Sequence, residues 1–294
     1  GSASNKLAYA YNIRNWIESI SSGGLFNISL YYGYNGNVSR MVCRCPGDNK
    51  TYGYNFAYDN LSRLTSAQSL IGGIITLGYA TNYSYDKNGN LLHLRRGGQT
   101  GLSGTGIIDN LSFTLNGNQL KAVNDDATAT ASNGFEFKDG AKLATEYMYD
   151  ANGSLIKDLN KGIEIQYNLL NLPSQVKFSD GSTITYTYGA DGVKLRTVHK
   201  IGGVTTTTDY CDNVIYENGT AKQLLTEEGY VSLSDKKYHY YLKDHQGNNR
   251  VVTDQAGGME EANYYYPFGG VFLSNGNDVQ AYKYNGKELD TKKG

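Results

Sequence analysis

The chain has 294 residues and a formal net charge of −1, from 27 basic and 28 acidic side chains. This balance argues against the strongly basic face of a nucleic-acid-binding protein, and no polybasic run indicates attraction to an anionic membrane. The 27 Tyr, 36 Gly and 3 Pro argue against a helical protein, because tyrosine favours pleated strands and glycine supplies turns. They also argue against simple disorder, because disordered chains are poor in aromatic residues.

Three regions are predicted along the chain. Residues 1–4 resemble a cloning scar, residues 5–235 form a repeat array, and residues 236–294 form a distinct C-terminal segment. No stretch approaches the roughly 18 consecutive apolar residues of a membrane span, and no signal peptide is visible.

One phrase recurs along the chain: an aromatic or β-branched residue, any residue, Tyr, Asp or Asn, a few turn residues that often include Gly, then Leu or Val. The two clearest copies contain Tyr83, Tyr85, Asp86, Gly89 and Leu91, and Tyr147, Tyr149, Asp150, Gly153 and Leu155. Looser copies lie at residues 9–17, 32–38, 56–64, 113–120, 165–172, 186–195 and 282–289. Repetition of this kind is typical of repeat architectures.

Each copy predicts a β-hairpin. The alternation of Tyr83 and Tyr85 places both rings on one face of a strand. Asp86 then begins a turn in which its carboxylate accepts backbone N–H bonds, and Gly89 takes the position of a bulged turn that needs a positive φ. Isolated hairpins are only marginally stable, so neighbouring copies must stack. The sequence therefore predicts an all-β fold, an array of hairpins in a long curved antiparallel sheet with almost no helix, for which residues 15–21 are the best candidate.

Other segments fit the same plan or interrupt it. Residues 181–188 alternate as a strand does, and Gly202-Gly203 lies between Val198 and a threonine run, which predicts another hairpin. Residues 97–106 are rich in glycine and residues 122–134 are small and polar. Both are predicted to be loops inserted into the array.

No catalytic site, cofactor or metal site is predicted. The odd number of cysteines (Cys43, Cys45 and Cys211) implies no disulfide framework, and Cys43 and Cys45 lack a second ligand pair at zinc-site spacing. On a strand, His239 and His245 would lie about 20 Å apart, too far for one metal ion. A Gly-x-Ser-x-Gly elbow and the Lys-Ser/Thr pair of a P-loop are both absent.

The phrase Tyr-x-Tyr-Asp-x-x-Gly-x-Leu resembles the YD repeat of Rhs proteins, teneurins and the TcC subunits of insecticidal toxin complexes. Two further phrases, at residues 240–251 and 264–290, resemble the end of the Rhs core in the style of Bacteroidetes members. The residues that carry this second likeness are Tyr241, Asp244, His245, Gly247, Arg250, Pro267, Gly269, Tyr284 and Gly286. Repeats followed in order by both phrases are a more specific signal than one repeat alone.

The resemblance implies a spiral of hairpins wound into a hollow β-shell, which in toxin members encloses a C-terminal toxin. The implied partners are the rest of the shell and that toxin, with no nucleic acid, and the implied location is secreted or at the cell surface. Many members cut themselves after the core through aspartates of an Asp-Pro-x-Gly-type motif. The chain ends at Gly294, before such a motif. We therefore expect a non-enzymatic structural fragment.

Two alternatives remain open. Exposed rows of tyrosine rings would suit a carbohydrate- or protein-binding cell-surface module, although packing of rings between neighbouring hairpins is favoured. The chain could instead be a truncated part of an aspartyl self-processing protein. We also expect self-association through unpaired edges at residues 9–17 and 282–289.

Overall fold

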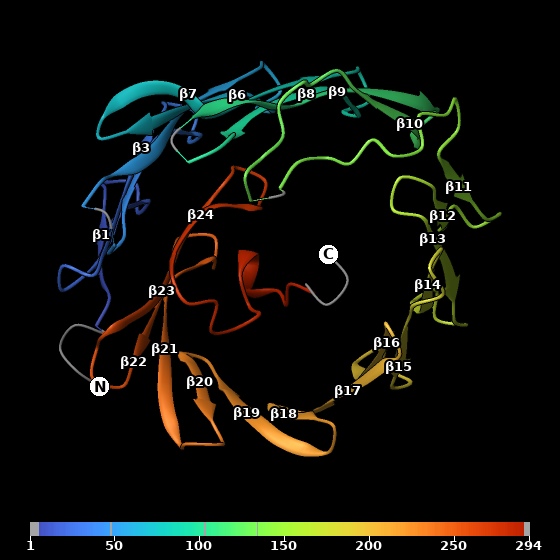
Figure 1. Cartoon of the computed structure of the whole chain (residues 1–294). Helices are drawn as coiled ribbons and strands as arrows, with labels where there is room; N and C mark the ends of the chain where they lie inside the picture. Colours follow the sequence, from blue (N-terminus) through green and yellow to red (C-terminus); the bar gives the residue numbers. More distant parts are fainter. Residues whose placement is uncertain (1–5, 48, 103, 134, 291–294) are drawn as a thin grey trace. The chain divides into compact units, whose positions relative to one another are not determined.

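The computed structural model of the chain describes residues 6–47, 49–102, 104–133 and 135–290 (Figure 1). The predicted cloning scar at residues 1–4 lies outside the described residues. The expected all-β fold is confirmed: the described residues form strands and turns, with a short 3₁₀ helix, η2 (Tyr284–Gly286), and no α-helix. No helix in this part of the chain is long and apolar enough to cross a membrane.

The strands form two sheets in which the strand order follows the sequence. The 10-stranded sheet contains β1 (Ala8–Tyr11), β2 (Ile17–Ser22), β3 (Phe26–Tyr32), β4 (Val38–Arg44), β5 (Tyr52–Tyr58), β6 (Leu64–Ile71), β7 (Ile74–Tyr85), β8 (Leu91–Gln99), β9 (Thr105–Asn116) and β10 (Gln119–Asp125). The 14-stranded sheet contains β11 (Tyr147–Tyr149), β12 (Leu155–Asp158), β13 (Ile163–Tyr167), β14 (Pro173–Phe178), β15 (Thr183–Tyr188), β16 (Lys194–Ile201), β17 (Val204–Cys211), β18 (Val214–Glu217), β19 (Thr220–Thr226), β20 (Gly229–Ser232), β21 (Lys237–Lys243), β22 (Asn249–Asp254), β23 (Met259–Tyr265) and β24 (Val271–Gly276).

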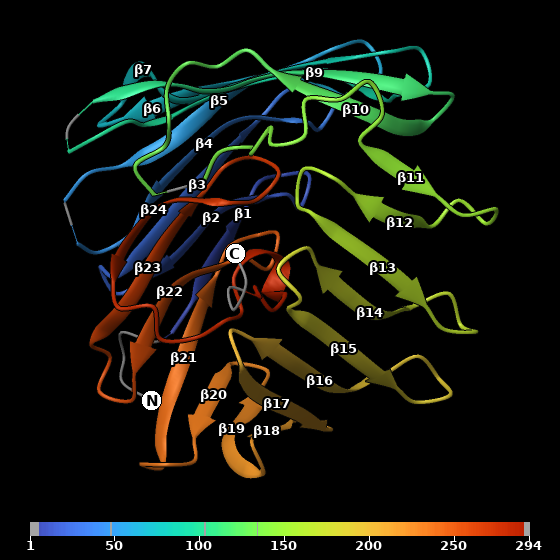
Figure 2. The same ribbon diagram turned by 45° about the vertical axis from the view of Figure 1, so that its right-hand side comes forward.

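The described residues cluster into two compact units. Unit 1 comprises the described residues within Gly1–Ser112, Asp125–Phe137 and His239–Leu289. Unit 2 comprises those within Phe113–Asn124, Lys138–Tyr238 and Asp290–Gly294. Figure 2 shows the strands of unit 2 from β11 to β20 as a ladder in which each strand is joined to the next by a short connection. The predicted boundary between residues 235 and 236 stays a prediction.

Most of the repeat copies form the expected hairpins. The copy at residues 83–91 joins β7 to β8, and the copy at residues 147–155 joins β11 to β12. The helix candidate at residues 15–21 is instead largely strand β2, which pairs with β1. The predicted Gly202-Gly203 hairpin joins β16 to β17, and both glycines have positive φ, +57° and +83°.

One copy is not a hairpin. Residues 282–289 form the 3₁₀ helix η2 and a single β-bridge between Tyr282 and Glu288. The expectation of paired strands here is wrong because tertiary contacts hold the segment in another conformation. The Lys283 ammonium is buried and donates hydrogen bonds to Glu261 and Asp278.

The prediction of a loop at residues 97–106 is only partly right, because residues 97–99 and 105–106 belong to strands and the loop is confined to the connection between them. Strand β8 extends to Gln99 and β9 begins at Thr105, with Gly98 paired to Gly106. A Cβ atom on Gly97 would lie 2.3 Å from the carbonyl oxygen of Leu77. These glycines therefore permit close packing of neighbouring backbones, a use of glycine that composition alone does not distinguish from flexibility.

The second predicted loop, residues 122–134, is partly strand, because β10 continues to Asp125. The connection that follows β10 separates the two sheets, so the strands form two sheets where one was expected. Within unit 1, Asp109 binds Phe137, the last residue of this connection that belongs to the unit. Its buried carboxylate accepts hydrogen bonds from the backbone N–H of Phe137 and from Arg96 Nε, at 2.6 and 2.7 Å.

The core of unit 1 is rich in aromatic rings. Tyr52 and Tyr264, from β5 and β23, lie with ring centroids 4.4 Å apart, and Tyr79 stacks on Phe272 at 4.3 Å. These contacts join β5 and β7 to β23 and β24 within unit 1. These buried rings therefore pack as expected of core residues, but against strands far away in the sequence and not against the neighbouring hairpin, whereas Tyr34 is 98% exposed.

Candidate functional site

The tyrosine that precedes each turn makes the same hydrogen bond in successive repeats. In the clearest copy, the Tyr85 hydroxyl donates to the backbone carbonyl of Leu64, the first residue of β6, at 2.8 Å. The other described instances are Tyr32 to Ile17, Tyr58 to Val38, Tyr149 to Leu120, Tyr167 to Leu155 and Tyr265 to Asn249. Each bond joins a hairpin to an earlier one, so the tyrosine of the repeat has a polar as well as an apolar role. We call this set the tyrosine ladder.

The turn that follows has the predicted chemistry. Asp86 Oδ1 accepts the backbone N–H groups of Asn88 and Asn90, both at 2.8 Å, and Gly89 has the expected positive φ of +91°. The Asn90 side chain and the backbone N–H groups lower the pKa of Asp86, although partial burial opposes them.

The second clear copy repeats this geometry. Asp150 Oδ1 accepts the N–H groups of Asn152 and Ser154, both at 2.9 Å, and Gly153 has a φ of +82°. The predicted left-handed conformation of both glycines is therefore confirmed. Leu91 and Leu155 begin the return strands β8 and β12, as expected.

The first tyrosine of each clear copy is buried. Tyr83 is 8% exposed, its ring lies 5.1 Å from that of Phe268, and burial raises its pKa to about 12. Tyr147 is equally buried in unit 2, and burial raises its pKa as well. These residues supply packing between elements of their own unit.

In the C-terminal segment, the same turn carries a buried ion pair. Asp244 begins a turn in which Gly247 has a φ of +80°, and its carboxylate accepts the Arg250 Nε–H at 2.7 Å. Burial by itself raises the pKa of Asp244, but Arg250 and the hydrogen bonds of Asn248 and Gln246 lower it overall. Burial likewise opposes the charge of Arg250, yet Asp244 and nearby groups raise its pKa.

The remaining core-like residues gather around this turn. Arg250 lies over the Tyr265 ring at 5.0 Å, and Tyr265 lies 5.8 Å from the ring of Tyr284. The Tyr284 hydroxyl donates to the carbonyl of Pro267 at 3.1 Å. Tyr284 also packs beside Gly269, where an added Cβ would lie 3.2 Å from the ring.

Two predicted residues of the C-terminal segment remain. Gly286 belongs to η2, with a φ of +62°, and Tyr241 is buried on β21. The structure thus brings most of the predicted C-terminal residues together in unit 1. Their contacts are internal ones that hold the tail against β22 and β23.

A cavity of about 460 Å³ lies beside this cluster in unit 1. Its lining residues are Val38, Met41, Phe56, Tyr58, Ser62, Arg63, Leu64, Tyr85, Gly89, His245, Gln246, Asn248, Arg250, Tyr265, Tyr266, Pro267 and Phe268. His245 is the histidine that lines this cavity. Burial lowers the pKa of its side chain; the nearby charge of Asp244 raises this pKa, and that of Arg250 lowers it. The other histidine considered in the sequence, His239, instead bonds Glu260 at 2.6 Å.

The sequence analysis did not predict that the thiols of Cys43 and Cys45 are buried in contact with each other. The Sγ atoms of Cys43 and Cys45 lie 3.5 Å apart, and both thiols are free and buried. The hydrogen bond from Cys45 lowers the pKa of Cys43, whereas burial raises that of Cys45 well above its usual value. The signal in the sequence was the alternation Met41-x-Cys43-x-Cys45, which spaces three sulfur-bearing side chains two residues apart.

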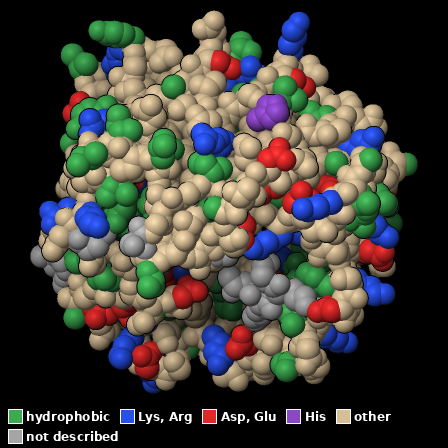
Figure 3. All heavy atoms as spheres, turned by 45° about the horizontal axis from the view of Figure 1, so that its top comes forward, with side chains coloured by type: hydrophobic (Ala, Val, Ile, Leu, Met, Phe, Trp, Pro, Cys, Tyr) green, Lys and Arg blue, Asp and Glu red, His purple; other side chains and the backbone are tan. Residues whose placement is uncertain are grey.

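In the described part of the chain, the side chains that usually bind metal ions do not form a cluster. Across the described ranges, no group of three or more His, Cys, Asp or Glu side chains is placed to hold a metal ion. On the face drawn in Figure 3, acidic and basic side chains are interspersed and neither sign gathers into one large patch.

These features define an all-β fold built from consecutive antiparallel hairpins. The chain is similar to solved structures of toxin complexes: TcdB2-TccC3 (TM-score 0.61), TcdB2-TccC3-Cdc42 (0.60) and the Photorhabdus luminescens Tc holotoxin pore with a TccC3 mutation (0.59). Each is 17% identical over 96–98% of the chain, which spans 17% of the matched chain's length. No family model and no curated protein matches. The predicted resemblance is thus confirmed at the level of the fold.

Proposed function

We propose that this chain is a non-enzymatic structural part of an Rhs-type shell that encapsulates or presents a C-terminal toxin, secreted or at the cell surface. The observation that carries the proposal is the likeness of fold to toxin-complex proteins over 97% of the chain. The tyrosine ladder supports it, because each hydroxyl bond joins one hairpin to an earlier one and so favours a continuous wall.

A non-enzymatic role is supported by the use of the ionisable groups in the C-terminal cluster. The Asp244 carboxylate accepts four hydrogen bonds, one from Gln246, two from Asn248 and one from Arg250, and Asp244 is 5% exposed. A carboxylate held in this way stabilises a turn and is poorly placed to exchange protons with a substrate.

The test is protection of the downstream polypeptide in the parent protein. The parent, expressed with the sequence that follows this chain, is treated with a broad-specificity protease, and the free downstream polypeptide is treated in parallel. We expect digestion of the enclosed polypeptide to be at least tenfold slower. Equal rates of digestion would contradict encapsulation, and a discrete self-cleaved product of this chain, seen by intact mass spectrometry, would contradict the non-enzymatic role.

The alternative, a carbohydrate- or protein-binding module, is favoured by the exposed ring of Tyr34 and the exposed side chain of Ile13 on neighbouring turns. A glycan array tests it directly. Specific binding that is lost on Tyr34→Ala would favour the binding module over a purely structural role.

A further inference from the structure

Strand β4 and the residue that follows it carry three soft sulfur atoms. Met41, Cys43 and Cys45 alternate along the chain, and they are 8%, 1% and 2% exposed. The two thiols are in contact, with Sγ atoms 3.5 Å apart. The Tyr264 hydroxyl accepts the backbone N–H of Cys45 at 2.9 Å, which fixes the backbone that carries the second thiol.

We propose that Cys43 and Cys45 form a binding site for a soft monovalent cation, Cu(I), with the Met41 thioether as a third ligand. Thiolate and thioether sulfur are the ligands that select Cu(I) in proteins. Two or three such ligands suffice for this ion, whereas structural zinc requires four. The lack of a larger ligand cluster in the described part of the chain therefore disfavours zinc and leaves the two-thiolate site open.

The geometry requires only a small movement of side chains. A metal–thiolate bond is roughly 2.3 Å long, so two bonds in line would separate the sulfur atoms by about 4.6 Å. The present separation is 3.5 Å, and rotation of either side chain supplies the difference.

The charge of the site is compensated locally. Binding releases one proton from each of the two thiols to solvent, so the bis-thiolate complex of one Cu(I) carries a net charge of −1. The buried guanidinium of Arg250 acts favourably on the negative charge of both Cys43 and Cys45, while Asp244 opposes it at Cys43.

The cavity described above gives access to the Met41 end of the proposed site. Met41 and Arg250 both line the cavity of about 460 Å³, which also reaches the exposed residue Ser62. A small ion or a chelated ion that enters this cavity meets the Met41 thioether first. The two buried thiols do not themselves line the cavity.

The pair is less well suited to a disulfide. In an extended chain, Cα atoms two residues apart are separated by about 6.6–6.8 Å. This separation lies at the upper limit of the Cα separations that disulfides adopt, roughly 4.4–6.8 Å, so the bond would be strained. Metal binding, which tolerates a wider sulfur separation, is therefore the better use of the pair.

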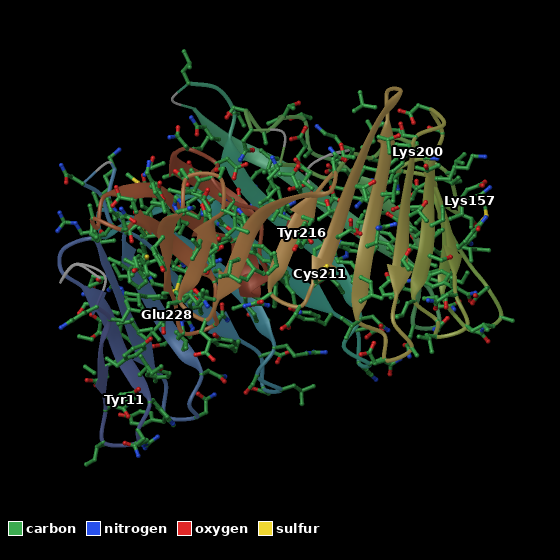
Figure 4. The ribbon with its side chains drawn as sticks, turned by 90° about the horizontal axis from the view of Figure 1, so that it is seen from below. Tyr11, Lys157, Lys200, Cys211, Tyr216 and Glu228 are labelled. Atoms are coloured by element: carbon green, nitrogen blue, oxygen red, sulfur yellow. The ribbon has the colours of Figure 1, made fainter. Side chains whose placement is uncertain are left out.

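The experiment is an anaerobic titration of the reduced chain with Cu(I) held by the chromophoric chelator bicinchoninate. We expect the wild type to remove one equivalent of Cu(I) from the chelator, and Cys43→Ser and Cys45→Ser each to lose affinity by at least tenfold. Met41→Leu should weaken binding severalfold. The matched control is Cys211→Ser, because Cys211 is an exposed thiol on β17 in unit 2 and should leave binding unchanged (Figure 4).

Failure of the wild type to compete with the chelator would overturn the proposal, as would loss of binding in Cys211→Ser. If the Ser variants at 43 and 45 do not fold, X-ray absorption of the Cu(I)-loaded Cys211→Ser protein decides. A shell of two or three sulfur atoms at roughly 2.3 Å is expected. A shell of nitrogen and oxygen atoms alone would reject the site.

Discussion

At the residue scale, a tyrosine hydroxyl group connects several of the hairpins to an earlier one. Tyr32, Tyr58 and Tyr85 donate to backbone carbonyls at 2.7, 2.9 and 2.8 Å in unit 1. A carbonyl at the start of a return strand would otherwise be partly buried without a partner, which is unfavourable. The repeat therefore requires tyrosine at this position and not simply an aromatic ring.

We expect Tyr85→Phe to lower the free energy of unfolding by about 1–2 kcal/mol, because the ring remains while the bond to the Leu64 carbonyl is lost. The Arg63 guanidinium, 4.9 Å from the ring centroid, keeps its aromatic partner in this variant. Urea denaturation measures the change. Tyr34→Phe is the matched control, since Tyr34 is 98% exposed and should show no change. Equal midpoints for Tyr85→Phe and the wild type would refute the role of the ladder.

His245 should make stability depend on pH. Burial lowers its folded-state pKa below the ordinary value of 6.5, so the unfolded chain binds the proton more readily. This contribution to stability is fully present above pH 6.5 and is lost as the pH falls from 6.5 through the folded-state pKa.

The measurement is urea denaturation of the wild type and His245→Gln from about pH 7.5 to about pH 5. We expect the wild type to lose more stability than the variant over this range. Three further histidines remain in both proteins and cancel in the comparison. Parallel pH profiles would show that His245 is as accessible to protons in the folded chain as in the unfolded chain.

At the element scale, the two clearest copies of the repeat each place one glycine in the left-handed conformation in the turn of the hairpin. Gly89 has a φ of +91°, and an added Cβ would meet no atom within 4 Å. A substitution here therefore tests backbone strain without steric collision. A separate register shift, between Ser84 and Tyr85, lies just outside this turn in the pairing of β7 with β8.

We expect Gly89→Val, and likewise Gly153→Val, to destabilise the chain by roughly 1–3 kcal/mol, because β-branched residues are strained at positive φ. Gly89→Asn is the control, since asparagine tolerates this conformation and should have a smaller effect. Thermal or urea denaturation gives both values. A valine variant as stable as the asparagine variant would contradict the assigned turn conformation.

At the scale of the whole molecule, the outer edge of β1 is open in the described part of the chain. All four residues of β1 are exposed, with Tyr9 at 49% and Tyr11 at 55%, and β1 ends the strand order of its sheet (Figure 4). Unpaired edges with apolar side chains pair readily with other chains. The second edge expected from the sequence, at residues 282–289, is not a strand, because that segment packs through Lys283 and Tyr284.

We therefore expect concentration-dependent self-association through β1. Sedimentation velocity over a wide concentration range should show a rising sedimentation coefficient for the wild type and a smaller rise for Tyr9→Lys, which places a charge on the edge. Tyr34→Lys is the control for a general effect of charge. A monomer at every concentration would mean that the β1 edge is protected in solution.

The sequence by itself determined the local plan of this protein. The alternation of Tyr83 and Tyr85, the Asp86 carboxylate and the positive φ of Gly89 act within one hairpin, so a few neighbouring residues encode them. For the same reason the resemblance to the Rhs repeat correctly indicated the fold. Clustering of the C-terminal residues around Asp244 also follows in part from their spacing within one turn.

Only the tertiary structure decided which distant groups meet. The Cys43 and Cys45 thiols lie within electrostatic range of Arg250, and the Tyr266 hydroxyl bonds the Gly97 carbonyl, although long stretches of chain separate these partners. Gly97 belongs to a strand because neighbouring backbones approach it closely, which composition does not reveal. Contacts between remote elements depend on how whole sheets pack, and that packing is a property of the complete core and not of any local pattern.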